Sequence, residues 1–104
     1  MDGKKMSYKN YEIYKDEKDF QLKVKVRLDL TGASVIELHV LLPDGDEVIW
    51  TCTAFSTDPT YLIYNVEEGD LSQLGEYSYQ AYVEKNGLKK YGRTRTFEVL
   101  ERYK

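Results

Sequence analysis

The chain of 104 residues has the length of one domain, and its 41% hydrophobic and 32% charged residues are typical of a soluble globular protein rather than a disordered one. A single cysteine, Cys52, excludes an internal disulfide, and no apolar run approaches the ~20 residues that a membrane-spanning helix needs. The net charge of −3 argues against a nucleic-acid partner, since domains that bind nucleic acid are usually basic.

The charges are separated along the chain. Eleven acidic residues and no lysine or arginine lie between Asp29 and Glu84. The residues before this segment include eight basic and five acidic ones, and the residues after it include seven basic and two acidic ones. We interpret the basic flanks as segments that neutralise the acidic middle in the folded protein, because surfaces of mixed sign are usual for small soluble domains.

Apolar residues recur at every second position in most of the chain, which is typical of β-strands. Residues 1–10 are polar and charged, and we expect them to form a flexible arm before one β domain over residues 11–104. A short first strand is expected at residues 11–14. Residues 20–28 then alternate without fault, so this strand has one apolar face and one basic face.

Residues 34–42 predict the next strand, and a tight hairpin turn follows it. The Pro-Asp-Gly sequence at 43–45 favours such a turn, because Pro suits its first central position and Gly tolerates a positive φ. The strand after the turn covers residues 48–55. We expect Trp50 to face inward there, since a buried indole fills the centre of a small sandwich. A fifth strand is expected at residues 61–66.

A longer connection over residues 66–75, with room for one helical turn, leads to a strand over residues 77–84. The Asn-Gly pair at 86–87 is a strong hairpin signal, because both central residues of the favoured turn need a positive φ. The last strand runs from about residue 91 to residue 100. Strands at this spacing predict an all-β fold, namely an antiparallel β-sandwich of about seven strands.

A glycine and two tyrosines mark the start of the sixth predicted strand. Gly75, Tyr77 and Tyr79 follow Leu71 at a spacing that resembles a corner of immunoglobulin-like sandwiches, where a tyrosine hydroxyl returns to the backbone a few residues upstream. Tyr77 takes that place, and Tyr79 stands where antibody domains carry their second cysteine. Without that disulfide, we expect the core to depend on aromatic packing between Trp50, Tyr79 and the aliphatic residues of the strands. The predicted topology is therefore immunoglobulin-like.

The order and spacing of several segments carry a family resemblance. These segments are Asp29-Leu30-Thr31-Gly32-Ala33, Pro43-Asp44-Gly45, Gly69-Asp70-Leu71, Gly75-x-Tyr77, Gln80-Ala81-Tyr82-Val83 and Phe97-x-Val99. Together they look like small immunoglobulin-like virion structural proteins of tailed bacteriophages and prophages, and are similar to the N-terminal domain of the phage upper baseplate protein. The resemblance implies a virion structural or accessory module with no catalytic residues to transfer. One departure is the Lys-Asp-Glu-Lys turn at 15–18, where family members often place Gly beside Asp.

The sequence offers no group of residues suited to catalysis. His39 lies among apolar residues of a predicted strand, and Cys52 has no basic neighbour in sequence to activate its thiol. No glycine-rich phosphate loop and no Cys/His metal spacing occur, and the acidic clusters at 44–47 and 67–70 lack the calcium-loop pattern. The basic positions over 23–27 lack interleaved aromatic residues. We therefore predict no enzyme activity, metal, cofactor or nucleic-acid partner.

An apolar outer face is the sequence feature most informative about function. In the immunoglobulin-like arrangement, the third, sixth and seventh predicted strands share one sheet. Its outward set of candidate interface residues is Val35, His39, Leu41, Tyr82 and Leu100. Aromatic and aliphatic side chains such as these dominate the energies of protein interfaces, so we predict docking to tail, baseplate or capsid proteins of a phage. Self-association is left open. We expect the protein in the virion, after synthesis in the host cytoplasm and without membrane contact, since residues 1–5 lack a signal-peptide apolar core.

The alternative hypothesis is a carbohydrate-binding or adhesin-type module that recognises host-surface glycans. Ten tyrosines motivate this hypothesis, because sugar rings stack on exposed aromatic side chains. Most of these tyrosines fall on inward positions or at turns of the predicted fold. That distribution favours the docking hypothesis.

Overall fold

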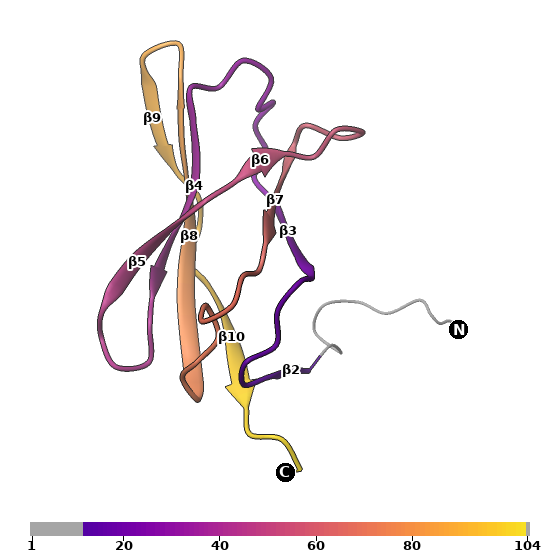
Figure 1. Cartoon of the computed structure of the whole chain (residues 1–104). Coiled ribbons are helices and arrows are strands. Elements are labelled where there is room, and N and C mark those ends of the chain that lie inside the picture. Colours follow the sequence, from indigo (N-terminus) through magenta and orange to yellow (C-terminus); the bar gives the residue numbers. More distant parts are fainter. Residues whose placement is uncertain (1–11, 104) are drawn as a thin grey trace.

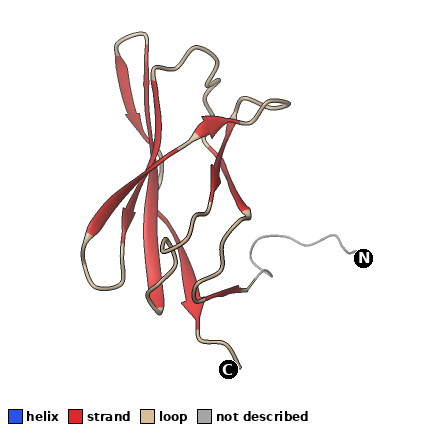
Figure 2. Cartoon of the chain, in the orientation of Figure 1, coloured by secondary structure: helices blue, strands red, loops and turns tan. Residues whose placement is uncertain are grey.

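The structure is a computed structural model that describes residues 12–103. Its strands form two sheets that face each other across a hydrophobic core (Figure 1). The described residues contain strands, turns and loops and no helix (Figure 2). The prediction of an all-β sandwich is confirmed. The predicted arm over residues 1–10 lies outside the described residues.

The larger sheet holds six strands in the order β2–β10–β8–β4–β5, with β9 paired to β8. Their bounds are Ile13–Tyr14 for β2, Arg95–Leu100 for β10, Gly75–Lys85 for β8, Val35–Leu41 for β4, Glu47–Thr51 for β5 and Leu88–Tyr91 for β9. All pairs are antiparallel except β2 and β10, which run parallel. The three strands expected to share one sheet are thus neighbours, as β10, β8 and β4.

The smaller sheet has the order β3–β7–β6, with β3 at Gln21–Lys25, β7 at Tyr61–Asn65 and β6 at Thr53–Ala54. The single strand expected over 48–55 is therefore wrong: β5 belongs to the larger sheet and β6 to the smaller one. The chain changes sheets at Cys52, which lies between these strands. The sequence does not reveal this change of sheet, because inward and outward residues alternate with a period of two in the strands of both sheets.

Two other boundaries differ from the sequence prediction. The strand expected over 91–100 consists of the end of β9 and all of β10, and residues 92–94 between them belong to neither strand. Residues 66–74 form turns and an irregular loop before β8, and no helical turn occurs there. The strand expected over 77–84 begins earlier, at Gly75, and continues to Lys85.

The core between the sheets confirms the inward position of Trp50, whose side chain is 5% exposed. Its indole stacks on the Tyr64 ring from the smaller sheet, with ring centroids 4.6 Å apart and planes inclined by 7°. Sequence analysis named Tyr79 as the partner, which is a wrong assignment: the Tyr79 ring lies against Phe97, at 5.7 Å. Tyr79 and Phe97 come from neighbouring strands of one sheet, whereas the Trp50–Tyr64 stack joins the two sheets.

Tyr77, the third residue of β8, is hydrogen-bonded to the turn that precedes this strand. Its side chain is fully buried, and its hydroxyl donates to the carbonyl oxygen of Gln73 at 3.3 Å and accepts from the Gln73 amide at 3.1 Å. Gly75 has φ of +117°, and a Cβ built on it would lie 3.2 Å from the Pro43 Cβ. The corner therefore needs glycine both for its backbone conformation and for the close approach of Pro43.

Two aspartates in the first turn adopt a backbone conformation that is unusual for residues other than glycine. Asp16 and Asp19 have φ values of 68° and 66°, in the left-handed region that glycine usually occupies. Aspartate is among the few other residues that tolerate this region. The Asp19 amide donates to the Val66 carbonyl oxygen at 2.8 Å, which ties the turn to the end of β7. The chain thus passes from the larger to the smaller sheet without glycine.

Candidate docking face

Three aromatic rings lie side by side on the outer face of the larger sheet. They belong to His39 on β4, Tyr82 on β8 and Tyr91 on β9, and we call them the aromatic patch. The His39 and Tyr82 centroids are 4.9 Å apart, those of Tyr82 and Tyr91 are 4.8 Å apart, and those of His39 and Tyr91 are 5.6 Å apart. Strand register creates the group, because Tyr82 is the cross-strand partner of Tyr91.

Two aliphatic residues extend the aromatic patch across the sheet. Ile49 on β5 is the cross-strand partner of His39 and is 58% exposed. Leu41 lies two positions beyond His39 on β4 and is 44% exposed, while Tyr91 is 57% exposed. A shallow hollow of about 480 Å³ borders this row, lined in part by Leu41, Gln80 and Tyr91. Apolar side chains thus form a continuous row over β9, β8, β4 and β5.

Carboxylates hold two of the three rings in place. The Glu37 Oε1 atom lies 2.9 Å from His39 Nε2, and the Tyr82 hydroxyl donates to the Glu84 carboxylate. The hydrogen bond to Glu84 raises the pKa of the Tyr82 phenol to about 12, so the phenol stays neutral. On the same face, the Gln80 amide donates to the Gly92 carbonyl oxygen at 3.0 Å, which fixes the segment that follows Tyr91.

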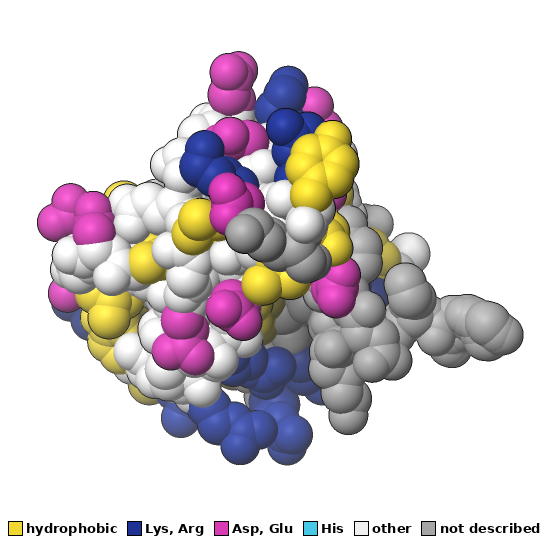
Figure 3. Space-filling model, turned by 90° about the horizontal axis from the view of Figure 1, so that it is seen from below, with side chains coloured by type: hydrophobic (Ala, Val, Ile, Leu, Met, Phe, Trp, Pro, Cys, Tyr) yellow, Lys and Arg dark blue, Asp and Glu magenta, His cyan; other side chains and the backbone are white. Residues whose placement is uncertain are grey.

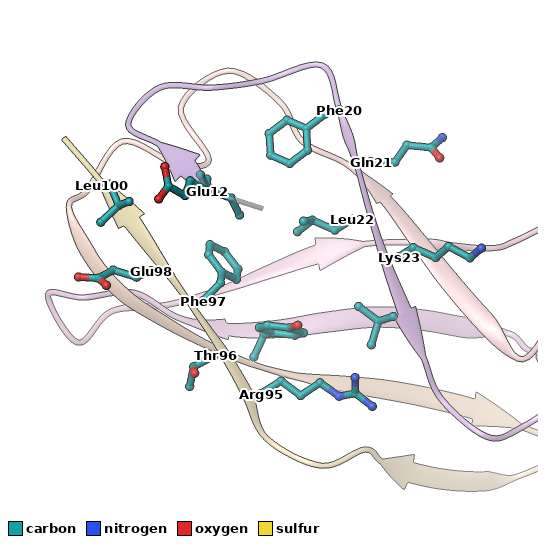
Figure 4. Close-up of a pocket in the computed structure, with 13 residues that line it drawn as sticks. Glu12, Phe20, Gln21, Leu22, Lys23, Arg95, Thr96, Phe97, Glu98 and Leu100 are labelled. Atoms are coloured by element: carbon teal, nitrogen blue, oxygen red, sulfur yellow. The ribbon is translucent and has the colours of Figure 1, made fainter. Parts of the chain in front are cut away.

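The structure brings three of the five predicted interface residues together, namely His39, Leu41 and Tyr82. Val35 is half-buried at the start of β4, beside Glu84 of β8. Leu100 is half-buried at the opposite end of the sheet and lines a different groove, together with Ile13 and Phe20. Figure 4 shows this groove, where Phe20, Leu22 and Phe97 point into the space between β3 and β10.

Sequence analysis missed Tyr91 and Ile49, although the turns contain the information that places them. A two-residue Asn86–Gly87 turn pairs Lys85 with Leu88, and counting back along both strands pairs Tyr82 with Tyr91. The prediction that Tyr91 begins the last strand concealed this pairing. Ile49 follows from the inward position of Trp50, because adjacent strand residues face opposite sides.

The remaining predicted groups form no site of their own. Cys52 is buried, and its burial raises the pKa of the thiol to about 12, so the reactive thiolate is scarce at neutral pH. Within residues 12–103, no three His, Cys, Asp or Glu side chains are grouped to hold a metal ion. In the same residues, no helix has the length and apolar character needed to cross a membrane.

Comparison with models of protein families finds no match for the chain. Comparison with curated proteins also finds no match.

Proposed function

We propose that this protein is a non-enzymatic module that docks onto other proteins through the aromatic patch together with Leu41 and Ile49. The observation that carries the proposal is the continuity of this row across four strands, with Tyr91, Leu41 and Ile49 exposed and Tyr82 and His39 half-buried between them. Tyrosines and large aliphatic side chains contribute much of the energy of protein interfaces. The hydrogen bonds that the rings of His39 and Tyr82 make to the carboxylates of Glu37 and Glu84 hold both rings in position before binding, which lowers the entropy cost of association.

The partner that we propose is a tail, baseplate or capsid protein of a phage. The order of turn sequences supports this choice through its resemblance to immunoglobulin-like virion proteins. The sheet orders are compatible with that topology, because β10, β8 and β4 adjoin in one sheet and β3, β7 and β6 form the other. The hydrogen bonds between Tyr77 and Gln73 are also those that the resemblance leads us to expect.

Pull-down of the full-length chain from a lysate of phage-producing cells, followed by mass spectrometry, tests this function. Tyr91→Glu and Leu41→Glu each place a charge on the docking face. Tyr103→Glu is the matched control, since Tyr103 is 93% exposed and lies beyond the end of β10. Circular dichroism and thermal unfolding establish that each variant remains folded.

The proposal predicts that a virion structural subunit binds the wild-type chain and the Tyr103→Glu variant, and that both variants of the docking face lose it. If both folded variants still bind that subunit, the proposed docking face is wrong. Recovery of no virion subunit by the wild-type chain would remove the virion assignment.

The aromatic patch also supports the second candidate function, the binding of host-surface glycans. Exposed tyrosine rings beside carboxylate and amide groups can stack on sugar rings and bind their hydroxyls. Tyr82 and Tyr91 provide such rings, and Glu47 and Gln80 line the adjacent hollow. The two functions are distinguished by a glycan array with the purified chain: binding that Tyr91→Ala abolishes and Tyr103→Ala retains supports the glycan module, whereas a blank array contradicts it.

A further inference from the structure

A second groove lies on the open side of the sandwich, between the end of β3 and the segment that joins β9 to β10. Its volume is about 520 Å³. Of its eleven lining residues, five are basic and none is acidic; the basic ones are Lys25, Arg27, Lys90, Arg93 and Arg95. Residues of the two basic flanks of the sequence thus meet in this groove.

Among residues 12–103, no carboxylate forms an ion pair with four of these cations. Arg27, Lys90 and Arg93 are exposed, and in the part of the chain that the structure describes none of them forms an ion pair. The Arg95 guanidinium donates to the Lys25 carbonyl oxygen at 3.3 Å, which fixes its position without removing its charge. In Figure 3 the largest group of Lys and Arg side chains lies at one margin of the molecule. Such a group attracts an anionic ligand.

Lys25 itself is directed away from this charge cluster. Its ammonium group donates to the Thr60 hydroxyl at 3.2 Å and lies 4.8 Å from the centre of the Tyr61 ring. Lys23 lies over the same ring and over Phe55. The two lysines of β3 therefore cover the outer face of the smaller sheet, and the side chains of Arg27, Lys90, Arg93 and Arg95 supply the charge of the groove.

The basic groove meets the groove of Figure 4 at Val24 and Arg95, and the edge of β3 runs along both; Gln21 and Lys23 line the groove of Figure 4, together with Glu12 and Glu98. β3 is the first strand of the smaller sheet, so one of its edges has no strand beside it among the described residues. The Val66 amide donates to Phe20 and the Val26 amide donates to Thr60, so the backbones of Phe20 and Val26 face β7. By the alternation of an antiparallel strand, the backbone groups of Gln21 and Lys23 face the open side.

A peptide suits this site better than a nucleic acid does. The phosphate backbone of a nucleic acid carries regularly spaced negative charges and binds best to a long basic surface. Outside the groove, the acidic middle segment of this sequence would repel such a backbone. Single-stranded nucleic acid also requires exposed rings on which bases stack, and Tyr79 is the one aromatic residue that lines the groove. An extended peptide can pair with a free strand edge and place a few carboxylates against the cations.

We propose that the open side of the sandwich binds an acidic, extended peptide segment of a partner protein. The peptide backbone pairs with the free edge of β3, and its carboxylates contact Arg27, Arg93 and Arg95. This site is separate from the aromatic patch, so the proposal stands or falls independently of the docking function.

Fluorescence anisotropy with the full-length chain tests the proposal. The probe is a labelled peptide of alternating Glu and Val, and the neutral comparison is the same peptide with Gln in place of Glu. The variant Arg27→Glu/Arg93→Glu reverses two charges of the groove. Lys15→Glu/Lys18→Glu is matched in charge and lies in the first turn, where both side chains are about half exposed.

We expect saturable binding of the acidic peptide at about 50 mM salt that weakens at about 300 mM, since screening shortens the reach of the charges. The neutral peptide and the groove variant should bind at least about tenfold more weakly, while the first-turn variant binds like the wild type. Amide resonances of Gln21 and Lys23 should shift on titration.

Three results would overturn the proposal. The first is the absence of saturable binding of the acidic peptide to the wild-type chain. The second is equal loss of binding in both charge-reversal variants, which would mean that net charge alone attracts the peptide. The third is tighter binding of a labelled thymidine oligonucleotide than of the peptide, which would assign the groove to nucleic acid.

Discussion

Removal of one hydroxyl group, by Tyr77→Phe, tests whether the corner before β8 stabilises the sandwich. The Tyr77 hydroxyl makes two hydrogen bonds to the backbone of Gln73, at 3.1 and 3.3 Å. The ring itself remains in the variant, and so does its stacking on Phe97, where the centroids are 5.1 Å apart. The substitution therefore isolates the hydrogen bonds from the packing of the core.

The expected loss of unfolding free energy is about 1–2 kcal/mol. A net hydrogen bond contributes about 0.5–1.5 kcal/mol, and a buried group left without its partner costs about 1–3 kcal/mol. Gln73 is half-buried, so water reaches part of its backbone and keeps the loss in the lower part of this range. For a domain of this size, such a loss lowers Tm by about 5–15 °C.

Urea and thermal unfolding followed by circular dichroism measure this effect. Tyr91→Phe is the control, because its hydroxyl lies on the exposed aromatic patch and its removal should change the free energy of unfolding by less than about 0.5 kcal/mol. Hydrogen exchange of the Gln73 amide should accelerate in Tyr77→Phe. A variant as stable as the wild type, with an unchanged Gln73 amide, would refute the view that the corner anchors residues 66–75.

Three further predictions concern buried or strained groups. Gly75→Ala should cost about 1–2 kcal/mol in urea unfolding, because alanine is strained at φ of +117° and its Cβ would lie 3.2 Å from Pro43; an unchanged midpoint would contradict this. Cys52 should resist a thiol reagent in the folded protein and react rapidly after unfolding, since burial raises the pKa of its thiol to about 12; fast labelling of the folded chain would show that the site opens. Burial and the hydrogen bond to Asp70 raise the pKa of the Tyr64 phenol above its ordinary value of 10.0. As the pH rises, the Tyr64 phenol loses its proton in the unfolded chain before it does so in the folded chain. The free energy of unfolding should therefore stay constant below about pH 10 and decrease above it. In Tyr64→Phe this decrease, measured by urea unfolding at a series of pH values, should be smaller.

Local sequence patterns predicted the strands and their buried faces well. Strict alternation identified the strand that contains Val24, and turn chemistry at 43–45 and 86–87 identified both hairpins of the larger sheet. These features depend on neighbours in the chain, where period and turn type determine the geometry. The inward position of Trp50 followed from the same alternation.

Features that depend on contact between distant segments could not be predicted in this way. The Trp50–Tyr64 stack requires knowledge of how one sheet lies on the other, and the step between sheets at Cys52 leaves the alternation intact. The basic groove combines residues 25–28 with residues 90–95, which no local pattern joins. Two of the three rings of the aromatic patch were predicted; the third, Tyr91, joins them through the register of the β8–β9 hairpin.

The parallel pair of β2 and β10 determines how the domain responds to mechanical load. Val99 and Leu100 lie beside Ile13 and Tyr14, and the Lys15 amide donates to the Leu100 carbonyl oxygen at 2.9 Å. Tension applied to the chain on the outer sides of this pair pulls the two strands in opposite directions along their length. The hydrogen bonds between β2 and β10 would then be loaded in shear and would have to break together, not one after another. This short strand pair would therefore resist stretching until it separates and the sandwich unfolds.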